Sequence, residues 1–91
     1  MNKTDLIDEI AKNSRLMKVD IENTINKALE IIKKQVKAGD DVTFSGFGTF
    51  TKIKRKARAG RNPHTGKEIK IPATVVPKFR PGKEFKKVLE E

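Results

Sequence analysis

A long β-hairpin with very little to bury dominates the second half of this sequence. The segments TKIKRKARA (51–59) and KEIKIPATVV (67–76) flank GRNPHTG (60–66), in which Asn-Pro and Thr-Gly each favour a turn. Two strands of about ten residues extend roughly 30 Å, which is more than the sheet of a small domain needs. We therefore expect the distal half of the hairpin to project into solvent as an arm.

The rest of the chain is too small to supply a large hydrophobic core. It has 91 residues, of which 35% are hydrophobic, and its only aromatic residues are five phenylalanines. A domain of this size buries a modest fraction of its surface and is marginally stable alone. Because part of the chain also projects, we expect one domain, residues 1–91, that gains further core by oligomerising.

The composition argues against several classes of protein. There is no cysteine and only one histidine, His64, so the ligands of a zinc site or a disulfide framework are missing. The glycines around His64 are spaced unlike those of a P-loop, and Gly46-Phe47-Gly48 lacks the third glycine of a dinucleotide-binding motif. No leader peptide or membrane span is evident. We expect a cytoplasmic protein that is not an enzyme and has no metal, cofactor or small-molecule substrate.

All of the excess positive charge lies in the second half of the chain. Residues 1–45 carry eight basic and eight acidic side chains, whereas residues 46–91 carry thirteen basic and four acidic ones. Between residues 52 and 78, nine basic side chains accompany a single acid, Glu68. Such asymmetry favours a polyanionic partner, nucleic acid before an anionic membrane surface, over a merely solvated surface.

The first half of the sequence predicts a pair of antiparallel helices. Asn2 has the character of an N-cap, with Asp5 three residues later. Apolar residues then recur with helical spacing, first to Ala11 and again over residues 19–38. Gly39 follows the second helix, at the position where a helix commonly ends in the left-handed conformation.

The pattern then changes to a period of two, which predicts strands. A strand begins at Val42, residues 46–48 form a tight reversal, and the hairpin follows. Pro72 and Pro77 restrict its second strand to a sheet edge or to bulges, because proline lacks a backbone donor. A short helix is expected over residues 83–89. The order α-α-β-β-β-α predicts an α+β fold, with helices on one face of a small three-stranded antiparallel sheet.

The predicted arm carries a row of cations. Because side chains alternate across a strand, four basic residues share one face of it. A row of like charges is unfavourable unless an anion neutralises it, and small residues such as Ala57, Ala59 and Gly60 permit close approach to a surface. A cationic ribbon of this kind suits the groove of a duplex, whose walls are lined by phosphates. The four residues are Lys52, Lys54, Lys56 and Arg58.

Pro63 at the turn of the arm admits two interpretations. An isolated Asn-Pro is usually a turn and nothing more. Here Arg61 and Lys67 flank the proline at the end of a projecting ribbon. We therefore expect an apolar wedge that inserts between base steps in the minor groove, while the cations hold the phosphates.

Four segments resemble one bacterial family over essentially the whole chain. They are MNKTDLIDEIA (1–11), GFGTF (46–50), RKARAGRNPHTGKEIKIPA (55–73) and FRPGK (79–83). The chain is similar to the family of the histone-like protein HU and of integration host factor. The sequence differs from the family's usual pattern at Met17, where Ser or Thr commonly caps the second helix, and at Pro81 and Phe85.

This resemblance implies an intertwined homodimer with no cofactor. Residues 1–45 would form a helical base with the first strand, residues 52–76 an arm, and residues 83–91 the last helix. The implied dimer contacts are Leu6, Leu29, Ile32, Phe47, Phe50 and Phe79, although packing of the phenylalanines within one chain is equally compatible. The implied DNA contacts are Lys3, Gly46, Arg80, Lys83 and Lys86 on the base and flanks, and Arg55, Arg58, Arg61, Asn62, Pro63, Thr65, Lys67 and Lys70 on the arm beside the lysine row.

The function implied is that of an architectural protein in the bacterial nucleoid. It would bind double-stranded DNA with low sequence specificity, bend and compact it, and favour bent, nicked or distorted sites. One alternative is a sequence-specific bender like integration host factor, which is typically a heterodimer. Another is that the basic arm binds RNA or an acidic protein.

Overall fold

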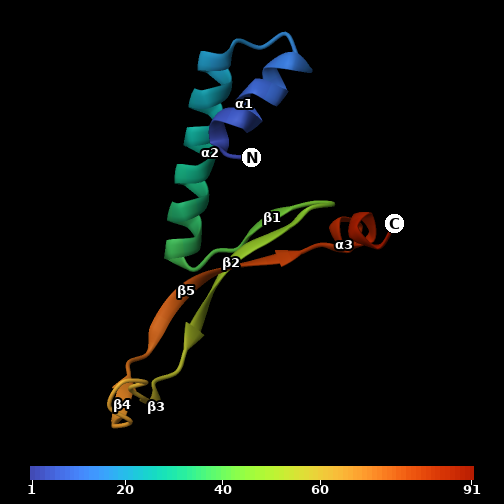
Figure 1. The fold of residues 1–91 in the computed structure, drawn as a ribbon. Coiled ribbons are helices and arrows are strands. Elements are labelled where there is room, and N and C mark those ends of the chain that lie inside the picture. The colour runs from blue at the N-terminus through green and yellow to red at the C-terminus, as the bar shows by residue number, and fades with distance from the viewer. The chain divides into compact units, whose positions relative to one another are not determined.

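The computed structural model describes all residues from 1 to 91 and contains the helices and strands in the expected order. The chain divides into two compact units, Met1–Lys34 and Gln35–Glu91. Three helices and two small antiparallel sheets confirm the α+β prediction (Figure 1). No helix combines the length and apolar character that a membrane crossing requires. The elements are α1 (Lys3–Lys12), α2 (Lys18–Ala38), β1 (Val42–Phe44), β2 (Gly48–Arg55), β3 (Arg58–Arg61), β4 (Glu68–Ile71), β5 (Thr74–Pro81) and α3 (Lys83–Glu90).

Helix α1 begins at a capping box in the first unit. The Asn2 side chain accepts a hydrogen bond from the Asp5 amide at 2.9 Å, and the Asp5 carboxylate accepts one from the Asn2 amide at 3.1 Å. These two bonds satisfy amides that the first turn of a helix leaves unpaired. The N-cap predicted from the sequence is therefore confirmed.

The first unit has a very small core. Helix α1 lies beside the first half of α2 (Figure 1), and only Ile7 and Ile21 are buried, with 7% and 4% of their surface exposed. The Lys18 ammonium joins the two helices through an ion pair with Asp8 at 3.0 Å. Other apolar side chains of these helices are half-buried, as at Ile10 and Ile25, or exposed.

Helix α2 starts and ends in different ways. At its start the Met17 carbonyl accepts from the amides of Asp20 and Ile21, and the Met17 side chain offers no cap. At its end Gly39 has φ of +97°, and the amides of Gly39 and Asp40 bond to carbonyls of the last turn. This is a Schellman motif, and it confirms the end predicted at Gly39.

The base sheet consists of β1, β2 and β5 in that order, all antiparallel. A tight reversal joins β1 to β2, where the Phe47 amide donates to the Phe44 carbonyl at 3.0 Å and Gly46 has φ of +80°. Strand β5 lies at an edge of the sheet and pairs only with β2. Pro77, which has no amide to donate, is tolerated at such an edge. The expectation for Pro77 is confirmed.

The phenylalanines of the second unit form one cluster on the base sheet and α3. The Phe79 ring lies 4.9 Å from that of Phe50 and 5.1 Å from that of Phe47, between ring centroids. Phe85 of α3 stacks on Phe47 at 5.2 Å. Gly48 is buried against this cluster, because a Cβ atom there would lie 2.5 Å from the Phe79 ring.

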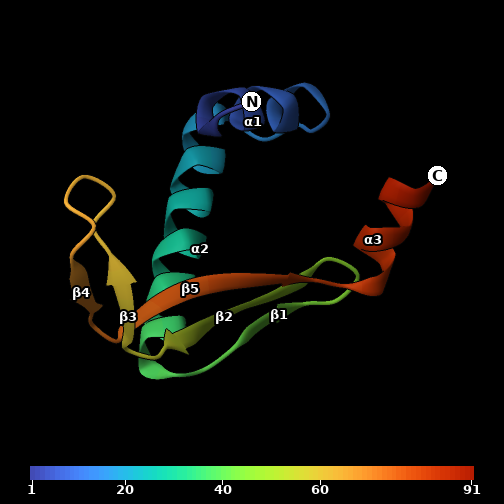
Figure 2. The same ribbon diagram turned by 60° about the horizontal axis from the view of Figure 1, so that its bottom comes forward.

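The hairpin continues beyond the base sheet as a distal ribbon, which we define as β3, β4 and the turn between them. Its pairs run from Arg58 with Ile71 to Arg61 with Glu68 and keep the register of β2 and β5. The long strands predicted over 51–60 and 67–76 are interrupted at residues 56–57 and 72–73, where Pro72 has no amide to donate. The ribbon and α3 lie at opposite ends of the β2–β5 pair (Figure 2).

Candidate nucleic-acid interface

The two faces of the base sheet differ in chemistry. Phe50 and Phe79 are paired across β2 and β5, and they place the aromatic cluster on one face. The neighbouring pairs lie on the opposite face because side chains alternate. We call this opposite side the polar face, and its residues are Thr43, Thr49, Thr51, Lys78 and Arg80.

Side-chain hydrogen bonds connect the residues of the polar face. The hydroxyl groups of Thr43 and Thr49 lie 3.1 Å apart, across β1 and β2. The carboxylate of Asp41 accepts from the Thr51 hydroxyl through one oxygen and from Arg80 Nη2 at 3.5 Å through the other. The Arg80 side chain is 58% exposed, so this predicted contact is open to a ligand.

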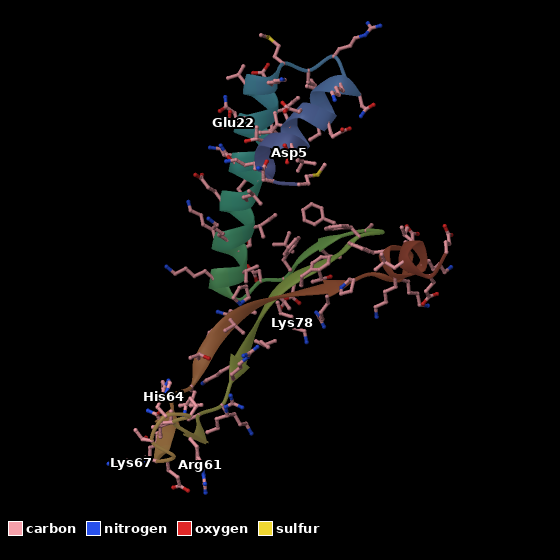
Figure 3. All side chains as sticks on the ribbon, in the orientation of Figure 1. Asp5, Glu22, Arg61, His64, Lys67 and Lys78 are labelled. Carbon is pink, nitrogen blue, oxygen red and sulfur yellow. The ribbon has the colours of Figure 1, made fainter.

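Cations continue from the polar face onto the arm. Lys78 is paired with Thr51, and Arg55 lies on the same face four pairs further along the ladder, beyond the Ile53–Val76 pair. Figure 3 shows Lys78 on β5, well before the turn of the arm. The sequence analysis did not select Lys78, although counting back by two from Arg80 would have found it.

The predicted row of lysines begins on the other face of the hairpin, and its first member has a structural role. The Lys52 ammonium donates to the Lys37 carbonyl at 3.0 Å, so it caps the C-terminal end of α2. Lys54, Lys56 and Arg58 are exposed. A hollow of about 460 Å³ at the interruption of the hairpin is lined by Arg55, Lys56, Arg58, Ile71, Pro72 and Thr74.

The two faces of the distal ribbon differ: Gly60, Ile69 and Ile71 lie on one face together with Arg58, and the other face is mostly charged. Gly60 is paired with Ile69, and a Cβ atom at Gly60 would lie 2.9 Å from Cδ1 of Ile71. The missing side chain thus leaves room for the isoleucine. The alternate pairs put Lys70 beside Ala59 and Arg61 beside Glu68 on the charged face.

Asn62 organises the turn at the end of the ribbon. Its amide donates to the Lys67 carbonyl at 2.9 Å, and its carbonyl accepts from the Gly66 amide at 2.8 Å. Its side-chain oxygen accepts from the His64 amide at 2.8 Å, which is an Asx turn. Asn62 was predicted as a DNA contact, and its oxygen is already engaged within the turn.

This arrangement presents Pro63 at the end of the arm. Pro63 is exposed, it has no amide that needs a partner, and the residues on either side of it carry the turn's hydrogen bonds. Figure 3 shows Arg61, His64 and Lys67 projecting around the turn. The Thr65 hydroxyl accepts weakly from the Lys67 amide at 3.4 Å. The turn therefore presents the apolar ring of Pro63 between the cations Arg61 and Lys67.

The other predicted contacts are spread over both units. Lys83 and Lys86 are exposed on α3. Gly46 lies against the Glu84 carboxylate, because a Cβ atom at Gly46 would be 2.6 Å from Oε2 of Glu84. Lys3 belongs to the first unit, where its ammonium donates to the Asn26 side chain at 2.9 Å.

Apolar side chains remain exposed in both units. Among the predicted dimer contacts, Leu6, Leu29 and Phe47 are 41%, 46% and 44% exposed. Phe50 and Phe79 pack within the chain, as the alternative interpretation allowed. Val88 and Leu89 of α3, which the sequence analysis did not select, are 66% and 76% exposed. Each unit of the single chain thus leaves apolar side chains uncovered, as chains that oligomerise do.

Comparison with known proteins gives matches over the full length. Residues 1–90 match the family described as bacterial DNA-binding protein. DNA-binding protein HU of Buchnera aphidicola subsp. Acyrthosiphon pisum (strain APS) is 47% identical over 91 residues, which are 100% of this chain and 99% of the relative. DNA-binding protein HU of Pasteurella multocida (strain Pm70) is 52% identical over 86 residues, 94% of this chain and 96% of the relative.

Solved structures give the same result. The protein of the Anabaena HU–DNA cocrystal structure is similar with a TM-score of 0.91 at 44% identity, over 98% of this chain and 97% of that one. HU from Thermotoga maritima is similar with a TM-score of 0.70 at 31% identity, over 98% of both chains.

Proposed function

Because this chain belongs to the bacterial DNA-binding protein family that includes the HU proteins, we propose that it bends double-stranded DNA through its arm. The family is one of architectural, non-enzymatic proteins of the bacterial nucleoid. The proposal concerns how this chain acts: it lays the arm in the minor groove, inserts Pro63 between base pairs and shows little sequence preference. The exposed proline, fixed between cations by the hydrogen bonds of Asn62, is the observation that carries it.

Binding energy comes mainly from the phosphates. Each phosphate that a lysine or arginine neutralises releases condensed cations, so the logarithm of the binding constant falls with log salt by about 0.9 per contact. Arg80, Lys78 and Arg55 lie on one face of the β2–β5 pair and lead from the polar face toward the arm, with the Ile53–Val76 pair between Lys78 and Arg55. We expect a duplex that contacts both the base sheet and the arm to be bent.

The wedge supplies that bend. Unstacking a base step costs roughly a few kcal/mol, which the additional contacts of a bent duplex offset. Pro63 suits this role because its ring is apolar and compact and its backbone leaves no donor unsatisfied. DNA that is already kinked, nicked or mismatched avoids part of the cost and binds more tightly.

Two copies of the chain form the working unit in this proposal. The second copy covers exposed apolar side chains of each unit, Leu6 and Leu29 in the first and Phe47 in the second, and a dimer supplies two arms to one duplex. The Anabaena relative was crystallised with DNA, which supports DNA as the partner of this chain. A homodimer also favours low sequence preference over a site-specific heterodimer like integration host factor.

A gel-shift series on intact, nicked and mismatched duplex at two salt concentrations tests this function. The expected result is tighter binding to nicked DNA and a steep loss of affinity at the higher salt. Pro63→Ala should weaken binding and bending on intact duplex more than on nicked duplex, and His64→Ala, in the same turn, is the matched control. Equal losses on both duplexes contradict the wedge, and equal binding of duplex RNA contradicts the minor-groove mode, because the A-form minor groove is wide and shallow.

A further inference from the structure

We propose that Asp41 competes with DNA phosphate for Arg80 and thereby limits the affinity of the polar face and its sensitivity to salt. The proposal rests on the function proposed above. Asp41 is the only carboxylate that bonds to residues of the polar face, where it contacts Arg80 Nη2 at 3.5 Å and the Thr51 hydroxyl. A phosphate that approaches Arg80 therefore competes with this carboxylate for Nη2 and meets its negative charge.

The position of Asp41 is fixed from three directions. The preceding residue, Asp40, donates its amide to the Gln35 carbonyl in the Schellman motif, and the following residue, Val42, begins β1. The Thr51 hydroxyl holds the second carboxylate oxygen. The carboxylate consequently stays on the polar face instead of turning away when another anion approaches.

The ion pair is weak enough to be exchanged. Its two side chains are 58% and 50% exposed, and exposed pairs contribute little to stability because solvent and salt screen them. A phosphate oxygen makes the same kind of charge-assisted contact with a guanidinium group as a carboxylate oxygen does. Arg80 can thus leave Asp41 for DNA, and the Asp41 charge then lies unpaired beside the phosphates.

This exchange has a signature in the salt dependence. Binding of Arg80 to a phosphate releases condensed cations from the DNA, but the carboxylate left behind attracts a cation from solution. The two changes oppose each other, so the contact through Arg80 contributes less to the salt slope than an unpaired cation does. Asp41 therefore weakens binding at low salt and makes it less sensitive to added salt.

The test is Asp41→Asn in the full-length protein, with affinity for a fixed intact duplex measured by fluorescence anisotropy over a range of salt. The amide retains an acceptor for Thr51 while the charge is removed. We expect affinity at low salt to rise roughly two- to fivefold, in line with exposed ion pairs, and the slope of log K against log salt to steepen by up to about 0.9. Circular dichroism checks that the variant is folded, and Thr51→Val, which frees the carboxylate without removing its charge, should change affinity in the same direction by less.

Two controls separate the proposal from a general effect of charge. Asp40→Asn removes the same charge one residue away, from a side chain that contacts neither Arg80 nor Thr51, and should change affinity and slope by less than half as much. In an Arg80→Gln background, Asp41→Asn should lose most of its effect. Equal effects of Asp40→Asn and Asp41→Asn, or an undiminished effect without Arg80, would overturn the proposal. A wild-type protein that fails to bind the duplex at any salt would instead refute the proposed function itself.

Discussion

The base sheet and the distal ribbon belong to one hairpin with one register, yet they are held together by different interactions. In the base sheet, Phe79 contacts the rings of Phe47 and Phe50, and Gly48 is buried beneath it. In the ribbon no residue is buried, and the turn is held by the hydrogen bonds of Asn62. Packing stabilises the base sheet, whereas the ribbon keeps its side chains available for a partner.

The difference also explains why the ribbon needs such a specific turn. An isolated two-stranded hairpin is marginally stable in water, and this one has only Gly60, Ile69 and Ile71 to pack on one face. The register inherited from the base sheet aligns its strands, and the Asx turn closes its end. A ribbon made in this way can be ordered without a core.

The first and largest expected effect is the loss of stability on removing a ring from the base sheet. Phe79→Ala deletes the ring at the centre of the cluster and should lower the free energy of unfolding by about 3 kcal/mol. Ile69→Ala in the ribbon should lower it by less than about 1 kcal/mol, because its side chain is 44% exposed. Urea unfolding followed by circular dichroism, at one protein concentration, measures both. Equal losses would show that the ribbon is as tightly packed as the base sheet.

A methyl group added at Gly48 tests the same packing from the other direction. The new Cβ atom would lie 2.5 Å from the Phe79 ring and 2.6 Å from the Arg80 carbonyl oxygen. Since one of these neighbours is backbone, Gly48→Ala should destabilise the protein by about 2 kcal/mol, again measured by urea unfolding. Gly39→Ala is the control for backbone strain. Gly39 has φ of +97° but open space around it, so this variant tests strain without steric overlap. A Gly48→Ala variant as stable as the wild type would refute the close packing.

Local signals were sufficient to predict the ends of the helices and the turns. The capping box at Asn2, the left-handed Gly39 and the Asn-Pro turn each depend on neighbours within about five residues, and the sequence contains those neighbours. The exposed place of Pro63 in the turn was predictable for the same reason. Its contact with DNA stays a prediction.

Long-range pairing was much harder to predict. The Lys52 ammonium caps α2, and Asp41 bridges two strands, because β2 and β5 align in one particular register. Period-two alternation predicted that the lysines share one face of the hairpin. It did not predict which part of the chain that face contacts. The interruption at Pro72 was also missed, because a proline at a strand edge is compatible with either a continuous or a broken ladder.

A smaller effect is expected at Gly66, where the ribbon depends on backbone conformation alone. Gly66 has φ of +67° and open space around it, so Gly66→Ala costs about 1 kcal/mol of backbone strain without a clash. The change should accelerate hydrogen exchange of the Asn62 and Gly66 amides by roughly fivefold, with little change in global unfolding. If the free energy of global unfolding falls by the whole cost of the backbone strain, the ribbon and the base sheet unfold as one unit.

The smallest effect on stability, and the clearest separation of the two regions, is expected for Arg58→Gln compared with Lys52→Gln. Arg58 is exposed on the ribbon without a hydrogen-bonding partner, so its replacement should change the free energy of unfolding by less than about 0.5 kcal/mol. It should nevertheless reduce the salt slope of DNA binding by about 0.9 for each phosphate that is no longer neutralised. Lys52→Gln removes the cap on α2 and should destabilise the fold by up to about 1 kcal/mol with a smaller change in slope. Urea unfolding and salt titrations of DNA binding on both variants test this. A larger loss of stability for Arg58→Gln and a larger change of salt slope for Lys52→Gln would mean that the base sheet binds the phosphates and the arm supports the fold.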